Sequence, residues 1–128
     1  MCFPLDVRAP GFSQGRRAED LAAAYLLLPG LELLERNFRD GPRENDLIAR
    51  QGAWRVVVEV RFRGRIDRGR PEESVDAGKR RHLLRAGRNY WLRHGRAVGR
   101  LRFDLIALHL TRDGLTLRHY PHFLIPSS

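Results

Sequence analysis

The sequence predicts an α/β fold in which helices flank a mixed β-sheet, in the order α-β-β-β-α-β-β. Two segments carry apolar residues every three or four positions, which is the spacing of one helix face. Five other segments alternate between apolar and polar residues or are apolar throughout, as strands are. The 128 residues, of which 42% are hydrophobic and 30% are charged, suit one soluble domain that spans residues 1–128.

The first helix is expected from residue 14 to residue 28, after an irregular lead-in over residues 1–13. Pro29 and Gly30 would end this helix, because proline cannot continue it and glycine favours the turn that follows. The residues that share one face of the helix and would be buried are Ala18, Leu21, Ala22, Tyr25 and Leu26.

Turn-forming residues then separate three predicted strands, which cover residues 31–39, 43–50 and 54–63. The third strand has the clearest period of two. Val56 and Val58 point to one side of it, and Val57 and Glu59 point to the other.

A loop, a second helix and two strands complete the chain. Residues 64–73 (GRIDRGRPEE) are too polar to form a core and are expected to be a mobile basic loop. The second helix should run from about Val75 to His94, with Ser74 as its N-cap. The last strands are expected over residues 101–110 and 115–120.

The basic charge is concentrated in one part of the chain. The net charge is +9 overall and +10 within residues 50–100, so the rest of the chain is close to neutral. Such a concentration favours a polyanionic partner, and nucleic acid is the first candidate. The alternative is a solvated basic face with no partner. Because Lys79 is the single lysine among the 24 basic residues, an arginine-rich coding bias also contributes.

Several other classes are excluded by composition. No apolar run approaches the ~20 residues of a membrane span, so no membrane partner is expected. The N-terminus lacks the pattern of a secretion signal, which favours a cytoplasmic location. The single cysteine, Cys2, excludes an internal disulfide and a cysteine-rich zinc site.

Two acidic residues, Asp46 and Glu59, are the strongest candidates for chemistry. A short turn at 51–52 would make their strands neighbours and bring the carboxylates close together. Both lie among apolar residues, where a carboxylate costs free energy unless it is compensated. A divalent cation is one compensator, since Mg²⁺ binds one or two carboxylates together with substrate phosphate oxygens. Ion pairs with Arg43, Arg61 or Arg102 are the alternative.

Glu19 could be a third acid of this site, because it lies at the edge of the apolar face of the first helix. Its alternative explanation is local. A glutamate in the first turns of a helix is favoured by the helix dipole alone.

The chain resembles the YraN family, whose members are similar to Holliday junction resolvases and other PD-(D/E)XK nucleases. The core of the resemblance is RENDLIA at 43–49 followed by VVVEVRFR at 56–63. The flanking motifs agree with it and extend the resemblance over about residues 15–123. These motifs are GRRAEDLAAAYL at 15–26, LERNFR at 34–39, PEESV at 71–75 with Lys79, and RFDLI at 102–106.

The resemblance implies a restriction-endonuclease-like fold and a site for Mg²⁺ or Mn²⁺. It implies that Glu19, Asp46 and Glu59 lie at this site, with the backbone carbonyl of Val60 as a further ligand. It also implies DNA as the substrate class, branched and damaged DNA included. Because relatives that cleave junctions work as dimers, a homodimer is a further expectation.

The chain departs from the family pattern at two places. Arg43-Glu44-Asn45-Asp46 stands where the family has Gly-Glu-Ile-Asp, and Glu59-Val60-Arg61 stands where the nuclease signature ends in Glu-x-Lys. Arginine keeps the positive charge and binds phosphate in a bidentate way, but it cannot act as a base.

The expected function is therefore a Mg²⁺- or Mn²⁺-dependent DNA endonuclease in which Arg61 replaces the lysine as a catalytic residue beside Asp46, Glu59 and Glu19. The alternatives are a non-catalytic nucleic-acid-binding module with the same fold, and a protein that binds an acidic protein partner. The residues expected to contact the nucleic-acid backbone are Arg63, Arg65, Arg68, Arg70, Lys79, Arg80, Arg81, Arg85 and Arg88.

Overall fold

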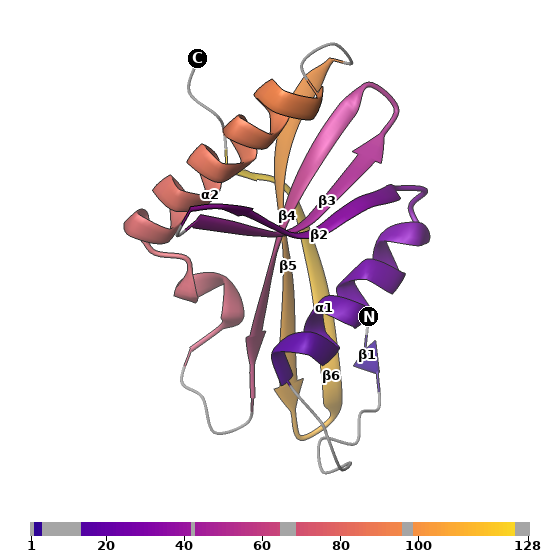
Figure 1. Cartoon of the computed structure of the whole chain (residues 1–128). Helices are drawn as coiled ribbons and strands as arrows, with labels where there is room; N and C mark the ends of the chain where they lie inside the picture. The colour runs from indigo at the N-terminus through magenta and orange to yellow at the C-terminus, as the bar shows by residue number, and fades with distance from the viewer. Residues whose placement is uncertain (1, 4–13, 42, 65–68, 96–98, 125–128) are drawn as a thin grey trace.

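The computed structural model describes residues 2–3, 14–41, 43–64, 69–95 and 99–124. Two helices lie on opposite sides of a twisted sheet (Figure 1). The helices are α1 (Gln14–Leu27) and α2 (Ala77–Tyr90), with a 3₁₀ turn η1 (Pro71–Ser74) before α2 and a π turn η2 (Trp91–Gly95) after it. The strands are β1 (Cys2–Phe3), β2 (Glu32–Asp40), β3 (Arg43–Gln51), β4 (Trp54–Arg63), β5 (Arg100–Thr111) and β6 (Gly114–Leu124).

The sheet is mixed and its strand order is β1-β6-β5-β4-β3-β2. Strands β4 and β5 run parallel, and all other neighbouring strands are antiparallel. A parallel pair needs a long crossover, and α2 lies in the connection between β4 and β5. The predicted α/β class and the order α-β-β-β-α-β-β are confirmed.

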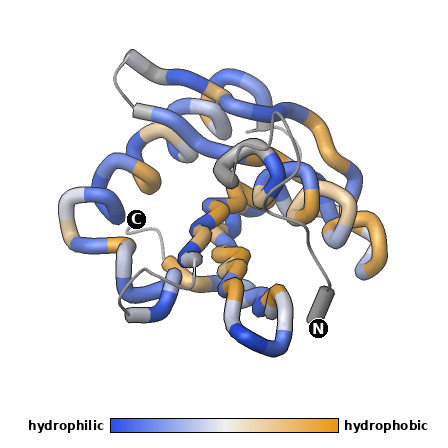
Figure 2. Tube along the Cα trace, turned by 90° about the horizontal axis from the view of Figure 1, so that it is seen from below, coloured by the Kyte–Doolittle hydropathy of each residue, from blue (hydrophilic) through white to orange (hydrophobic). Residues whose placement is uncertain are grey.

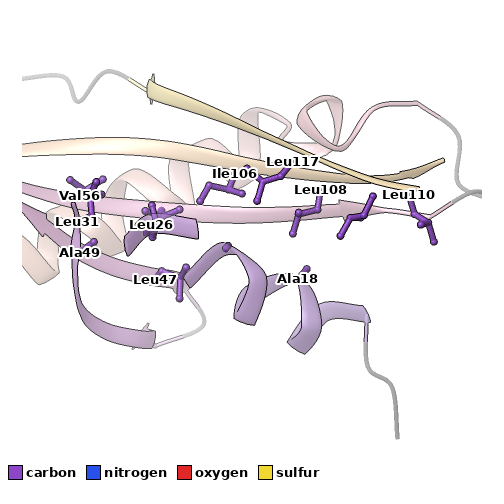
Figure 3. Packing of buried hydrophobic residues seen from close by; sticks show 13 residues of the cluster. Ala18, Leu26, Leu31, Leu47, Ala49, Val56, Ile106, Leu108, Leu110 and Leu117 are labelled. Carbon is purple, nitrogen blue, oxygen red and sulfur yellow. The ribbon is translucent and has the colours of Figure 1, made fainter. Parts of the chain in front are cut away.

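One hydrophobic core lies between α1 and the sheet (Figure 3). The helix contributes Ala22 and Leu26, which are fully buried, as the three- and four-residue spacing predicted. Opposite them lie Val56 and Val58 of β4, from the side of that strand predicted to face away from Glu59. Figure 2 shows the hydrophobic stretches in the strands at the middle of the molecule and hydrophilic ones along much of its outline.

A second core lies between α2 and the other face of the sheet, and it contains Val57, Leu83 and Phe103. The helix lies very close to the sheet at Gly87. A Cβ at this position would stand 2.5 Å from a ring carbon of Phe103, so only glycine permits this approach. Since Glu59 follows Val57 by two residues on β4, the α2 side is also the side of the predicted site.

The structure corrects three details of the sequence prediction. The N-cap of α2 is Asp76, whose side chain accepts a hydrogen bond from the backbone N–H of Lys79, so the helix begins later than Ser74 would place it. Within the predicted lead-in, Cys2 and Phe3 form β1 and pair with β6. The end of the predicted basic loop is ordered, because residues 71–74 form η1 with Pro71 buried. Residues 4–13 and 65–68 lie outside the described part of the chain.

Candidate functional site

Asp46 and Glu59, together the acidic pair, meet where β3 and β4 separate. The two strands pair from Leu47 with Val58 to Gln51 with Trp54. Just beyond the last paired residues, the backbone N–H of Val60 donates a hydrogen bond of 2.8 Å to Asp46 Oδ2. The Asp46 side chain thus takes the place of a backbone carbonyl of β3 as the acceptor. Glu59 is 3% exposed. The short hairpin thus holds one carboxylate fixed by a backbone donor beside a second, buried one.

Glu59 disfavours the charged form of Asp46. The pKa of Asp46 is raised from 3.8 to about 8, first by burial and then by its hydrogen bond with Glu59 and the charge of Glu59. The Val60 N–H and the Lys79 ammonium act in the opposite direction and lower this pKa. A carboxylate whose pKa is shifted by burial and a close like charge is typical of functional sites.

Lys79 is the cation that the structure brings to the acidic pair. Its Nζ lies 3.2 Å from Glu59 Oε2, and its side chain is 34% exposed. Asp76 caps α2 and fixes Lys79 in the first turn of that helix. The contact lacks hydrogen-bond geometry, so Glu59 Oε2 is a buried acceptor without a hydrogen-bond donor among the described residues.

Arg61 is engaged elsewhere. Its Nε donates to Ser74 Oγ over 2.7 Å, and its Nη2 lies 3.5 Å from the carbonyl oxygen of Ser74. Arg61 therefore ties β4 to η1, and its guanidinium makes no ion pair with Asp46 or Glu59 in the described structure. Arg102, the other described candidate counterion, pairs with Asp104 instead.

Glu19 lies within electrostatic reach of the acidic pair. Its pKa is raised, first by burial and next by the charge of Asp46, while Arg36 acts to lower it. Its direct partner is Arg36, whose Nη2 lies 3.8 Å from Glu19 Oε2 and 2.7 Å from Asp20 Oδ1. Among the described residues, no three His, Cys, Asp or Glu side chains form a group that could hold a metal ion.

The predicted nucleic-acid contacts fall into different environments. On α2, the predicted contacts that are exposed are Arg80, Arg81, Arg85 and Arg88. Arg80 makes internal contacts as well, since its guanidinium lies 5.5 Å from the centre of the Phe123 ring and its Nε donates to the Val75 carbonyl. Arg63 is partly buried. Arg65 and Arg68 lie outside the described residues.

Arg70 lines a cavity of about 230 Å³ beside η1. His109 of β5 and Arg118 of β6 also line it, together with Glu72, which accepts a hydrogen bond from the Tyr120 hydroxyl. The cavity therefore combines basic side chains with a carboxylate that already has a partner.

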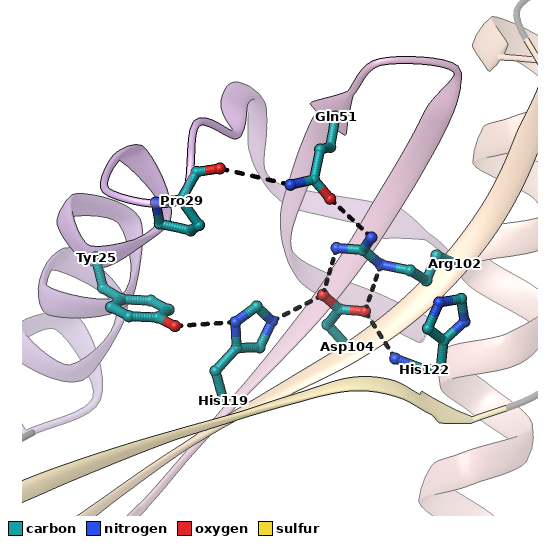
Figure 4. A network of polar contacts seen from close by, with 7 residues as sticks. All are labelled: Tyr25, Pro29, Gln51, Arg102, Asp104, His119 and His122. Carbon is teal, nitrogen blue, oxygen red and sulfur yellow. Dashed lines mark hydrogen bonds and ion pairs between the residues drawn. The ribbon is translucent and has the colours of Figure 1, made fainter.

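Sequence reasoning missed a second polar cluster, the Asp104 network (Figure 4). Asp104 is buried and accepts two hydrogen bonds of 2.9 Å from Arg102 and one of 3.1 Å from the His122 backbone N–H. His119 Nε2 lies 2.8 Å from Asp104, and His119 Nδ1 lies 3.1 Å from the Tyr25 hydroxyl of α1. The signal that could have revealed it is Arg102-x-Asp104 on one face of an apolar strand.

The donors around Asp104 hold its pKa below the ordinary value against the effect of burial, with His119 and Arg102 as the main contributors. Gln51 accepts a further hydrogen bond of 2.8 Å from Arg102, so the network joins the β3–β4 turn to β5, β6 and α1. These contacts stabilise the fold on the α1 side of the sheet.

The acidic pair has the donor set that a hard divalent cation requires. Asp46 and Glu59 are oxygen ligands of the kind Mg²⁺ and Mn²⁺ bind. Glu59 Oε2 has lone pairs that no hydrogen-bond donor of the described residues uses. The pair therefore fits such an ion, while Glu19 is placed to contribute charge at longer range.

Fold and site define an α/β protein with a pair of carboxylates, one buried and one partly buried, at the place where two strands of a mixed sheet separate. Residues 18–108 match the model of the Uncharacterised protein family UPF0102. Relatives named UPF0102 protein include one from Syntrophotalea carbinolica, 40% identical over 85% of this chain and 89% of its own length. Another, from Dechloromonas aromatica, is 43% identical over 86% of this chain and 87% of its own length. The chain belongs to UPF0102, which confirms the predicted YraN family.

No described helix is both long enough and apolar enough to cross a membrane.

Proposed function

We propose that the protein is a divalent-metal-dependent DNA endonuclease, with branched and damaged DNA among its substrates and the cytoplasm as its location. The observation that carries the proposal is the acidic pair, in which a buried carboxylate oxygen lacks a hydrogen-bond donor beside a second carboxylate. A structural ion pair would be expected to satisfy its buried oxygens with donors. The basic surface of α2 adds charge suited to a phosphate backbone.

The residues divide the work by their positions. Asp46 and Glu59 would hold Mg²⁺ or Mn²⁺ with the Val60 carbonyl, and Glu19 would add negative charge nearby. When bound, the ion polarises the phosphate and lowers the pKa of a water molecule. The Val60 N–H keeps Asp46 in one orientation. The apolar residues beside the pair, among them Ile48 and Val57, limit access of water and strengthen electrostatic interactions there.

Metal binding and cleavage test this proposal together. Mn²⁺ is titrated into the metal-free protein by calorimetry, and labelled duplex, single-stranded and branched DNA are incubated with Mg²⁺ or Mn²⁺. We expect Glu59→Gln to weaken Mn²⁺ binding more than about a hundredfold, because loss of a ligand exceeds the usual cost of losing a supporting residue. Cleavage should be lost with it.

Glu32→Gln is the matched control, since Glu32 is an ion-paired carboxylate on β2 whose partner is Arg50. It should bind Mn²⁺ and cut as the wild type does. Equal Mn²⁺ affinity in Glu59→Gln and the wild type would refute the metal site. DNA binding without cleavage would favour the non-catalytic module, for which the replacement of lysine by Arg61 is the supporting feature. The homodimer stays a prediction.

A further inference from the structure

We infer that Lys79 of α2, rather than the residue two positions after Glu59, supplies the cation that acts on the phosphate in this protein. The inference rests on the proposed function. Its starting observation is that the Lys79 ammonium lies 3.2 Å from Glu59 Oε2, while the strand position holds Arg61. Lys79 is partly exposed and Glu59 is buried, so the ammonium stands between the acidic pair and solvent, where a bound phosphate would lie.

Helix stability does not explain a lysine at this place. Lys79 lies in the first turn of α2, three residues after the N-cap Asp76. The positive end of the helix dipole favours acidic side chains there and disfavours basic ones. The compensating interaction is with Glu59 on β4. The position of Lys79 is thus explained by the site and not by the helix.

Arg61 has a different task. Its Nε is held by the Ser74 hydroxyl over 2.7 Å, and Ser74 is the last residue of η1. To reach a phosphate, the guanidinium would have to leave this partner, and β4 would lose its link to η1. An ammonium that is already beside the acidic pair needs no such rearrangement.

Composition points the same way. Lys79 is the single lysine, and the other 23 of the 24 basic residues are arginine. A coding bias replaces lysine by arginine wherever either residue serves. The position that keeps lysine is then one where the wide, planar guanidinium does not serve and a compact ammonium does.

The chemical role follows from the charge and size of the ammonium. In hydrolysis, the oxygen of water forms a bond to phosphorus, and the bond from phosphorus to the leaving ester oxygen breaks. The water proton passes to solvent, and the leaving oxygen takes a proton from solvent. Lys79 keeps its proton throughout and donates a hydrogen bond to the non-bridging phosphate oxygen on which negative charge grows. Removing one such donor costs about 10²–10³ in rate.

The experiment compares Lys79→Gln, Lys79→Arg and Arg61→Lys, with Arg112→Gln as the control for loss of an exposed positive charge at the β5–β6 turn. Three quantities are measured for each protein: the cleavage rate with Mn²⁺, the Mn²⁺ affinity by calorimetry, and the urea midpoint of unfolding.

We expect Lys79→Gln to cut at least about a hundredfold more slowly than the wild type. Its Mn²⁺ affinity should be equal or higher, because a cation that competes for Glu59 has been removed. Lys79→Arg should have the urea midpoint of the wild type, since arginine can pair with Glu59. Its cleavage rate should nevertheless be at least about tenfold lower than that of the wild type. Arg61→Lys alone should cut no faster than the wild type. Added to Lys79→Gln, it should not raise the cleavage rate above that of Lys79→Gln. Arg112→Gln should match the wild type.

The outcomes separate this inference from the proposed function. A wild-type cleavage rate in Lys79→Gln or in Lys79→Arg overturns the inference and leaves the nuclease in place. Recovery of cleavage when Arg61→Lys is added to Lys79→Gln does the same. A large loss of Mn²⁺ affinity in Lys79→Gln also overturns it, because Lys79 would then only organise Glu59. A wild type that binds no Mn²⁺, or binds it and cuts no DNA, overturns the proposed function and this inference with it.

Discussion

Replacing Asp46 by asparagine should stabilise the metal-free protein at neutral pH. Asparagine has nearly the same shape, and its Oδ1 can still accept the hydrogen bond from the Val60 N–H. What it removes is a carboxylate whose pKa in the folded protein is raised from 3.8 to about 8 by burial and by Glu59. In the unfolded chain this group returns to its ordinary pKa, so ionisation favours unfolding.

The sign and size follow from proton linkage. Between pH 3.8 and about 8 the folded protein holds a proton that the unfolded chain releases, so wild-type stability falls as pH rises through this window. One proton corresponds to about 1.4 kcal/mol per pH unit, which sets an upper limit of about 4 kcal/mol at pH 7. Because buried charges are partly relieved by relaxation and water entry, we expect Asp46→Asn to be more stable than the wild type by about 2 kcal/mol at pH 7.

The assay is urea unfolding of both proteins in EDTA at pH 5, 6, 7 and 8, followed by tryptophan fluorescence. The difference in unfolding free energy should be smallest at pH 5 and should increase towards pH 8. Groups other than Asp46 and its coupled neighbour Glu59 contribute equally to both proteins and cancel in the difference. Parallel stability curves, or a variant that is less stable at every pH, would refute the argument that the acidic pair is strained without metal.

Three further predictions concern the fold and the basic surface. Asp104→Asn should lower the free energy of unfolding, measured in urea, by about 3 kcal/mol, because it leaves Arg102 buried without its carboxylate. Glu32→Gln, which removes a carboxylate from an exposed ion pair, should lower it by less than about 1 kcal/mol. Gly87→Ala should lower stability by about 2 kcal/mol, because its Cβ would stand 2.5 Å from Phe103, whereas Gly78→Ala on the same helix meets no atom within 3.4 Å and should be neutral or stabilising. Neutralising the exposed α2 residues Arg81, Arg85 and Arg88 together should reduce the slope of log affinity for duplex DNA against log salt concentration by about 3. Fluorescence anisotropy measures this slope, and an unchanged slope would exclude this face of α2 from DNA binding.

Periodicity predicted most of the fold because each helix has one apolar face and the long strands either alternate or are apolar throughout. The alternation in residues 54–63 predicted β4 with its observed bounds, and the apolar spacing in α1 predicted its buried face. The strand β1 could not be predicted, since two residues show no period and their partner, β6, lies far along the chain. The N-cap of α2 was misplaced because Ser74 and Asp76 are both good caps. Only the packing of η1 decides between them, since there Ser74 accepts a hydrogen bond from Arg61.

Part of the candidate site was also accessible from the sequence. A two-residue turn brings neighbouring strands together, so the proximity of Asp46 and Glu59 could be expected from the predicted turn at 51–52, although the observed turn lies one residue later, between the paired Gln51 and Trp54. The contact between Lys79 and Glu59 could not be derived from the sequence, because it depends on where α2 lies along the sheet and on which face of the helix packs against the sheet. That placement is set by close approaches such as Gly87 against Phe103, which no local pattern encodes.

The contrast between the two buried acidic groups is the strongest argument that one of them is kept for chemistry. Asp104 receives donors from Arg102, His119 and the His122 backbone, and its pKa is lowered even though it is buried. Asp46 receives the Val60 N–H, its pKa is raised, and its neighbour Glu59 keeps an oxygen without a hydrogen-bond donor among the described residues. Both groups belong to the same sheet of the same arginine-rich chain, so donors were available in both places. A fold that surrounds one buried carboxylate with donors, and leaves a buried oxygen of the acidic pair without one, accepts a cost in stability that a cation bound from solution would remove.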